Sequence, residues 1–186
     1  MKTDVVIVGA GPSGIFTALE LLRKGSKKKI VIVEKGKAIE NRHCPKTKTK
    51  QCVNCKPNCH ITTGFSGAGA FSDGKLFTRS KKRGDYNKAL RTLVFHGAKE
   101  EILYEAHPHI GTDKLPRIMQ NIRQRIVECG GEYLFERKVT DIKIERGRVV
   151  AVESGGEWIE AAAFVLATGH SARDIYELLY RKGYLD

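Results

Sequence analysis

Aromatic residues and long apolar runs are both scarce in this chain of 186 residues, and each shortage excludes a class of function. Aromatic residues make up 8% of the sequence, and none of them alternates with the lysines of its basic clusters. A surface that binds single strands of nucleic acid needs aromatic rings on which bases stack, so nucleic-acid binding is disfavoured. No apolar run approaches the roughly 18 residues of a membrane-spanning helix, and we expect no contact with a membrane.

Acidic residues are outnumbered, because 33 lysines and arginines face 21 aspartates and glutamates and leave a net charge of +12. The excess gathers at 27–29, 46–56 and 81–83. Such clusters favour polyanionic partners, although lysine-rich surfaces more often serve solubility. A signal peptide is also lacking, since the first residues lead directly into a strand, and this predicts a cytoplasmic protein. The odd number of cysteines, 5, argues against a disulfide framework.

The chain begins with a predicted strand, helix and second strand. Asp4–Val8 is a continuous run rich in β-branched residues, as expected for a strand buried on both faces of a parallel sheet. Apolar residues then recur at helical spacing until Gly25, and Lys29–Glu34 supplies the second strand. A strand, helix and strand of this length form a right-handed βαβ unit, the smallest form of a Rossmann half.

The turn between the first strand and the helix carries a GxGxxG motif. Gly9 permits the tight turn, Gly11 lets the backbone approach a pyrophosphate, and Gly14 lets the helix pack closely on the strand. Backbone amides at the start of the helix then face the phosphates. Glu34 follows Gly14 by about 20 residues, the distance of the carboxylate that binds a ribose diol, and its charge would repel the 2′-phosphate of NADP. The order of strand, glycines, helix and acid predicts a dinucleotide site.

A long segment without clear periodicity, 35–83, follows the second strand and is predicted to be a functional loop. Its four cysteines have the spacing C-x7-C-x2-C-x3-C, at Cys44, Cys52, Cys55 and Cys59. Three interpretations stay open: a four-thiolate zinc or iron–sulfur site, a redox dithiol formed by the second and third cysteines, and inert thiols. None of these residues is assigned to a metal.

Small residues dominate the end of this segment, 64–75, where glycines alternate with alanines at 67–70. Such residues let the backbone run close to a flat or charged ligand and offer their amides to phosphate oxygens. Phe65 and Phe71 are apolar anchors that a flexible linker would not carry.

The remaining chain predicts helices and then short strands. One helix is expected over 85–97. A second helix is expected to begin after Thr112, its N-cap, and to end at Gly130. From 132 to 161 a period of two predicts short strands of an antiparallel meander, with turns at 146–147 and 155–156. A buried strand at 163–169 then ends in Ala-Thr-Gly, and a helix follows through Leu179. The predicted fold is α/β, with a Rossmann-like parallel sheet and a β-meander inserted before its last parallel strand.

These pieces resemble the FAD-binding domain of two-dinucleotide-binding-fold flavoproteins. The resemblance rests on VVIVGAGPSG at 5–14, Glu34, and AFVLATG at 163–169. The segments FSGAGAFSDGKL, PHIGTDKL and ATGHSARD are similar to the family described as FAD-dependent, or NAD(FAD)-utilising, dehydrogenases. The likeness extends from Asp4 to about Gly183, which is nearly the whole chain.

The resemblance implies an FAD-binding domain over 1–186, with a cofactor loop at 35–83 and the meander at 132–161. The adenosine ribose would lie on Glu34, the pyrophosphate at 9–14, and the flavin half near 66–72. The implied cofactor residues are Gly9, Gly11, Pro12, Ser13, Gly14, Glu34, Lys35, Ser66, Gly67, Ala68, Gly69, Ala70, Val139, Ala167, Thr168 and Gly169. Proteins of this kind are much longer, so we expect an N-terminal part whose flavin end is unfinished, with the remainder of the flavoenzyme as a missing or separate segment.

The predicted function is therefore an FAD-dependent oxidoreductase, or its FAD-binding portion, acting on a small-molecule substrate or an electron donor such as NADH. The isoalloxazine ring carries hydride chemistry in such proteins. No residue stands out as a general base; His170 follows the cofactor turn, and a histidine bonded to a loop carbonyl is an equal alternative. The competing hypotheses are a non-catalytic nucleotide-binding module and electron transfer through a metal held by the cysteine loop.

Overall fold

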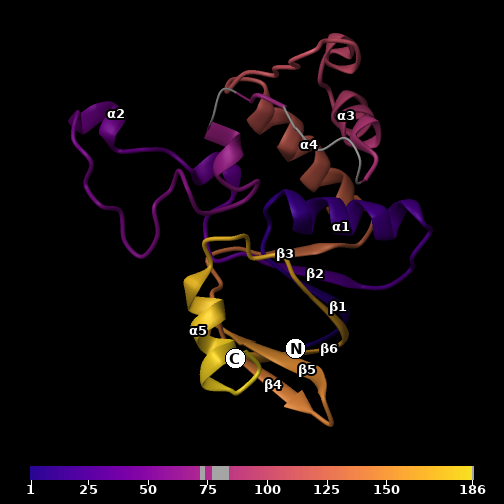
Figure 1. The fold of residues 1–186 in the computed structure, drawn as a ribbon, viewed down its shortest axis with the longest axis vertical. Helices are drawn as coiled ribbons and strands as arrows, with labels where there is room; N and C mark the ends of the chain where they lie inside the picture. The colour runs from indigo at the N-terminus through magenta and orange to yellow at the C-terminus, as the bar shows by residue number, and fades with distance from the viewer. Residues whose placement is uncertain (72–73, 77–83, 186) are drawn as a thin grey trace.

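The structure is a computed structural model that describes residues 1–71, 74–76 and 84–185. Its strands form a sheet in the order β3-β2-β1-β6-β5-β4 (Figure 1). The first four strands in this order run parallel, and β5 and β4 continue the sheet in antiparallel pairing. The predicted α/β fold with a parallel sheet and an antiparallel extension is confirmed. The strands are β1 (Lys2–Val8), β2 (Ile30–Val33), β3 (Glu132–Leu134), β4 (Val139–Glu145), β5 (Arg148–Ser154) and β6 (Glu157–Leu166).

Helices cover both faces of the sheet. Figure 1 shows α1, α3 and α4 on one side and α5 on the other. The helices are α1 (Pro12–Arg23), α2 (Lys46–Thr49), α3 (Tyr86–Phe95), α4 (Leu115–Glu128) and α5 (Arg173–Arg181), with short 3₁₀ turns η1 (Ile39–Asn41), η2 (Ala68–Phe71) and η3 (Glu100–Leu103). No helix within the described ranges is long and apolar enough to cross a membrane.

The β1-α1-β2 unit forms as its sequence pattern predicts. All four side chains of β2 are at most 1% exposed, because this strand is covered on both faces. It pairs in parallel with β1, which in turn pairs in parallel with β6. The carboxyl ends of these three strands therefore meet at one edge of the sheet.

The structure corrects the predicted extent of the meander. β3 pairs in parallel with β2 and belongs to the Rossmann part, so the antiparallel extension begins only at Val139. β6 is one continuous strand of 10 residues, where the sequence predicted a short strand at 157–160 and a separate strand from Ala163. Its first residues, 157–160, pair with β5 and its residues 160–166 pair with β1, so one strand joins the two parts of the sheet.

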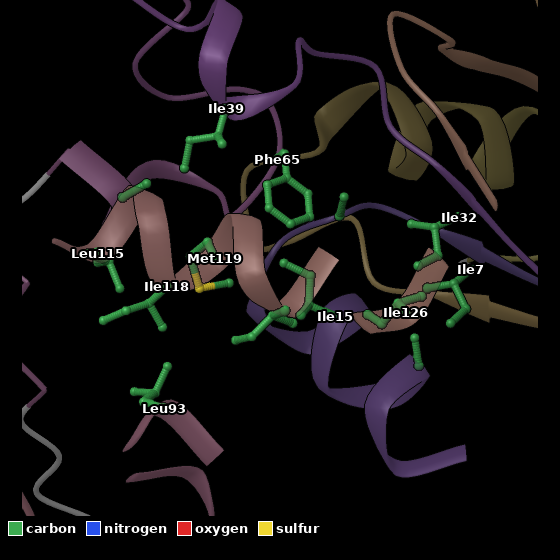
Figure 2. Packing of buried hydrophobic residues seen from close by; sticks show 14 of the residues in the cluster. Ile7, Ile15, Ile32, Ile39, Phe65, Leu93, Leu115, Ile118, Met119 and Ile126 are labelled. Carbon is green, nitrogen blue, oxygen red and sulfur yellow. The ribbon is translucent and has the colours of Figure 1, made fainter. Parts of the chain in front are cut away.

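The hydrophobic core has two parts, one on each face of the sheet. One lies among β1, β2, α1, α3 and α4, and the other lies between the opposite face and α5. Figure 2 shows Phe65, a loop residue, inserted among the labelled residues of the first part. Phe65 is fully buried and packs edge-on against Tyr133 and Phe135. This anchor holds the Gly/Ser-rich loop against the sheet.

The start of α3 agrees with the sequence prediction, the start of α4 does not, and α5 runs to Arg181, two residues beyond the predicted end. Asp85 caps α3 by accepting a hydrogen bond from the Lys88 amide at 2.9 Å. Thr112 was predicted to cap the next helix, and this was wrong, since α4 begins at Leu115 with Lys114 at the N-cap. Pro116 lies in its first turn, where a proline costs no helical hydrogen bond.

Candidate cofactor site

A cleft of about 560 Å³ lies at the carboxyl ends of β1, β2 and β6. In open α/β sheets, ligands bind in the crevice at this edge, where the helix connections diverge. The volume lies within the range of roughly 300–1,000 Å³ that is usual for ligand pockets. Predicted cofactor residues that line the cleft are Gly9, Gly11, Pro12, Ser13, Glu34, Lys35, Gly67, Ala68, Val139, Ala167, Thr168 and Gly169.

The glycines of the first turn have distinct steric surroundings. A Cβ on Gly9 would lie 2.4 Å from the carbonyl oxygen of Ala167, and a Cβ on Gly14 would lie 2.0 Å from that of Gly9. Neither position can therefore take a side chain without moving the backbone. Gly11 differs, because its φ is −76° and nothing lies within 4 Å of the position of a Cβ. The space beside Gly11 is part of the cleft.

The first turn of α1 leaves its backbone amides available. Gly11 is the N-cap residue and provides no side-chain hydrogen bond, Pro12 occupies the first helical position, and the first turn holds no acidic residue. The partial positive charge of a helix N-terminus is thus not neutralised by a side chain of the helix itself. This end of α1 can accept an anion from the cleft.

Glu34 is buried, with 6% of its surface exposed, directly after β2. Its two carboxylate oxygens accept hydrogen bonds from the amides of Ala10 and Gly36, each at 2.8 Å. The carboxylate is thereby fixed between the glycine turn and the loop that leaves β2. Each oxygen has a further lone pair, and the residue lines the cleft, so the carboxylate can also accept from a ligand hydroxyl.

The Gly/Ser-rich loop is fastened to the same turn. The Ser66 amide donates to the carbonyl oxygen of Ala10 at 2.7 Å, and the Phe65 amide donates to that of Lys37 at 3.0 Å. Gly67 and Ala68 reach the cleft, whereas Ser66, Gly69 and Ala70 are not among its lining residues. Ser66 and Ala70 are instead buried within the loop. Ser72 and the basic cluster at 81–83 lie outside the described residues.

Arg42 organises this loop and was not foreseen from the sequence. Arg42 is only 4% exposed, and its guanidinium donates to the carbonyl oxygens of His60, Ile61, Phe65 and Gly67. It also lies 4.7 Å from the ring centroid of Phe71. Burial lowers the pKa of Arg42 below its ordinary value, while the charge of Glu34 opposes that shift. One arginine in a lysine-rich segment looks like a solvated side chain, so no sequence signal identified it.

A network of charges closes the other side of the cleft. Asp174, in the first turn of α5, forms ion pairs with two lysines: its Oδ2 lies 3.6 Å from Nζ of Lys35 and 3.2 Å from Nζ of Lys138. Partial burial acts to raise the pKa of Asp174, but the hydrogen bond from Lys138 and the charge of Lys35 hold it below its ordinary value. Asp174 thus joins the loop after β2 and the residue before β4 to the start of α5. Lys138 and Asp174 line the cleft, and sequence reasoning missed both.

His170 is exposed and lines the cleft directly after the Ala-Thr-Gly turn. The backbone holds this turn in place, because the Ala167 amide donates to the carbonyl oxygen of Val8 at 2.8 Å. His170 is therefore positioned on the wall of the cleft.

The loop cysteines are free thiols around a second hollow. Cys44 and Cys55 are half-buried, and Cys52 and Cys59 are exposed. Hydrogen bonds from the backbone of Thr62 and neighbouring Ile61 lower the pKa of Cys59 below its ordinary value. Across the described residues, no group of three or more His, Cys, Asp or Glu side chains is already arranged to hold a metal ion.

Comparison with known proteins assigns the family. Residues 3–178 match the family model described as pyridine nucleotide-disulphide oxidoreductase. The chain belongs to the pyridine nucleotide-disulphide oxidoreductase family. This assignment agrees with the Rossmann-like fold and with the position of the cleft, and it favours an oxidoreductase portion over a non-catalytic module.

The relatives of this chain are considerably longer than the chain itself. A Clostridium beijerinckii protein described as uncharacterized is 40% identical over 182 residues, which are 98% of this chain and 34% of that protein. FixC of Escherichia coli K12 is 26% identical over 166 residues, 89% of this chain and 36% of FixC. The chain thus spans about a third of the length of these relatives. The structure of THI4 from Thermovibrio ammonificans has the same fold, with a TM-score of 0.62 at 18% identity over 100% of this chain and 64% of THI4.

Proposed function

We propose that the chain is the FAD-binding portion of a flavoprotein oxidoreductase, formed by residues 1–186. The observation that carries this proposal is the space beside Gly11, where a Cβ would meet nothing within 4 Å, in the cleft that also holds Glu34. A dinucleotide needs both features, one for its pyrophosphate and the other for its ribose. Membership of an oxidoreductase family supports the reaction class.

The pyrophosphate would lie against the first turn of α1. No side chain caps this turn, so the amides of Ser13 and Gly14 can face the phosphates, and the missing side chain of Gly11 gives room for close approach. Phosphate groups bind at helix N-termini because the amides and the helix dipole both favour negative charge.

The adenosine half would lie between Glu34, Lys35 and Val139, which line one end of the cleft. Glu34 is held by two backbone amides, so it would meet the ribose diol without rearrangement. FMN lacks an adenosine, and this end of the cleft would then have no ligand, so we favour FAD over FMN. A 2′-phosphate beside the buried carboxylate would be repelled, which disfavours NADP.

The flavin half would extend towards Gly67, Ala68 and the turn at Thr168 and Gly169. A bound flavin supplies hydride transfer. The chain's own residues would orient the cofactor and shield it, and the predicted pocket residues Ser66, Gly69 and Ala70 would contribute through the loop that they support. An electron donor such as NADH and a small-molecule substrate are the expected partners, as in the FAD-dependent dehydrogenases that the sequence resembles. A cytoplasmic location stays a prediction.

The test replaces Gly11 by alanine. Since the added methyl group meets nothing in the structure, Gly11→Ala should change the free energy of unfolding by less than about 1 kcal/mol. It would, however, occupy the space reserved for the pyrophosphate and should weaken FAD binding at least about tenfold, or about 1.4 kcal/mol. Flavin fluorescence titration measures the binding, and Arg91→Ala, an exposed position on α3, is the control. Unchanged FAD affinity in folded Gly11→Ala would refute the proposed position of the pyrophosphate.

A further inference from the structure

A second hollow, of about 470 Å³, lies in the cysteine loop apart from the cofactor cleft. Its lining includes all four loop cysteines together with His60. Residues 16 positions apart in sequence are thus folded around a common space, although 50–67 contains no helix or strand. The fifth cysteine, Cys129, is exposed at the end of α4 and lies outside this hollow.

The lining of the hollow has the chemistry of a thiolate metal site. Four thiolates form the complete ligand set of a tetrahedral structural zinc ion. Such a centre has a net negative charge, and Lys46 and Lys56 line the same hollow, where their ammonium groups would offset that charge. His60 Nδ1 lies 3.2 Å from the carbonyl oxygen of His43, which fixes the orientation of its ring beside the thiols.

We propose that Cys44, Cys52, Cys55 and Cys59 bind one Zn²⁺ ion in this hollow. The thiols surround the space without being arranged as ligands, since no group of three or more metal-binding side chains in the described ranges has that arrangement. Binding would draw the loop together, and each thiol that binds would release its proton to solvent. A segment with little regular structure and few apolar side chains gains most from such a cross-link.

The zinc site would also stabilise one wall of the cofactor cleft. Arg42 donates to the carbonyl oxygens of His60 and Ile61, which line the hollow, and to that of Gly67, which lines the cleft. Residues 62–64, between these two groups, also line the cleft. Ordering of the cysteine loop is therefore transmitted through Arg42 to the cleft wall. This coupling rests on the proposed function, whereas the zinc site itself does not.

The experiment measures zinc directly. The protein, purified under reducing and anaerobic conditions, is titrated with ZnCl₂ against a chromophoric chelator, and bound metal is determined by elemental analysis. We expect one zinc per chain, and each of the four Cys→Ser substitutions should weaken zinc binding at least about tenfold. Cys129→Ser is the matched control and should leave zinc binding unchanged. Co²⁺ in place of zinc should give the absorption of a tetrahedral thiolate complex in the unmutated protein, which does not depend on the folding of any variant.

Three results would overturn the proposal: no zinc bound at micromolar concentration, zinc binding that survives all four substitutions, or iron with acid-labile sulfide in the anaerobic protein. FAD affinity measured with and without zinc separates this proposal from the cofactor proposal. Zinc binding without FAD binding would contradict only the proposed function. FAD binding without zinc binding would contradict only the zinc site.

Discussion

Replacing Arg42 by alanine tests whether one buried guanidinium holds the loop that forms a wall of the cofactor cleft. The substitution removes the donor for four carbonyl oxygens and a cation that lies over the Phe71 ring. Hydrogen bonds from a charged group contribute about 1.5–3 kcal/mol each. Burial of the guanidinium offsets part of this sum, as the lowered pKa of Arg42 indicates. We therefore expect Arg42→Ala to reduce the free energy of unfolding by about 3 kcal/mol.

The assay is urea denaturation followed by circular dichroism, together with limited proteolysis of the loop. Arg42→Lys keeps the charge but loses the planar fork that reaches several carbonyls at once, so it should lie between the wild type and Arg42→Ala. Arg91→Ala, exposed on α3, controls for the loss of an arginine and should differ from the wild type by less than about 0.5 kcal/mol. If Arg42→Ala unfolds at the same urea concentration as Arg91→Ala and its loop is cut no faster, the assigned role of Arg42 is refuted.

Three further substitutions test the site and the core. Glu34→Gln offers one acceptor oxygen where two backbone amides now donate. We therefore expect the free energy of unfolding, measured by urea denaturation, to fall by about 1–3 kcal/mol and FAD to bind more weakly. Unchanged stability together with unchanged FAD affinity would show that the carboxylate is dispensable. Tyr133→Phe removes a buried hydroxyl that has no hydrogen-bond partner among the described residues, and the free energy of unfolding should stay level or rise by about 1 kcal/mol; a clear loss would reveal a partner for the hydroxyl. Asp174 has a lowered pKa in the folded protein, so its contribution, about 1 kcal/mol, is present above about pH 4 and is lost as the pH falls through its folded pKa. Asp174→Asn should therefore be less stable than the wild type at pH 7, and this difference should shrink as the pH falls through the folded pKa of Asp174; a difference that does not change with pH would contradict the ion pairs with Lys35 and Lys138.

The first βαβ unit could be predicted from the sequence because its constraints are local. Gly9 and Gly14 are required by close approaches between backbone atoms, and Glu34 follows a strand whose apolar run fixes its boundaries. Each feature has a signature within a few residues. The turns at 146–147 and 155–156 were likewise predicted, because all four turn residues have a positive φ and Gly is favoured there.

Features that depend on pairing between distant segments could not be predicted. The alternation of side chains around Tyr133 is the same for a parallel and an antiparallel strand, so the sequence did not indicate that β3 pairs with β2. The length of β6 follows from its two different neighbours, β1 and β5. Arg42 acquires its role only because four loop carbonyls converge on it. The start of α4 could have been predicted, since Pro116 favours the first turn of a helix over its interior.

A comparative titration of the purified protein with FAD, FMN and ADP tests the central claim most directly. Visible absorption and flavin fluorescence report binding, and ADP, which has the adenosine and pyrophosphate groups without a flavin, should compete with FAD. We predict one FAD per chain at micromolar concentration, competition by ADP, and FMN binding that is at least about tenfold weaker, or about 1.4 kcal/mol. Equal binding of FMN and FAD, or no FAD binding by the folded protein, would contradict a dinucleotide site built on Gly11 and Glu34.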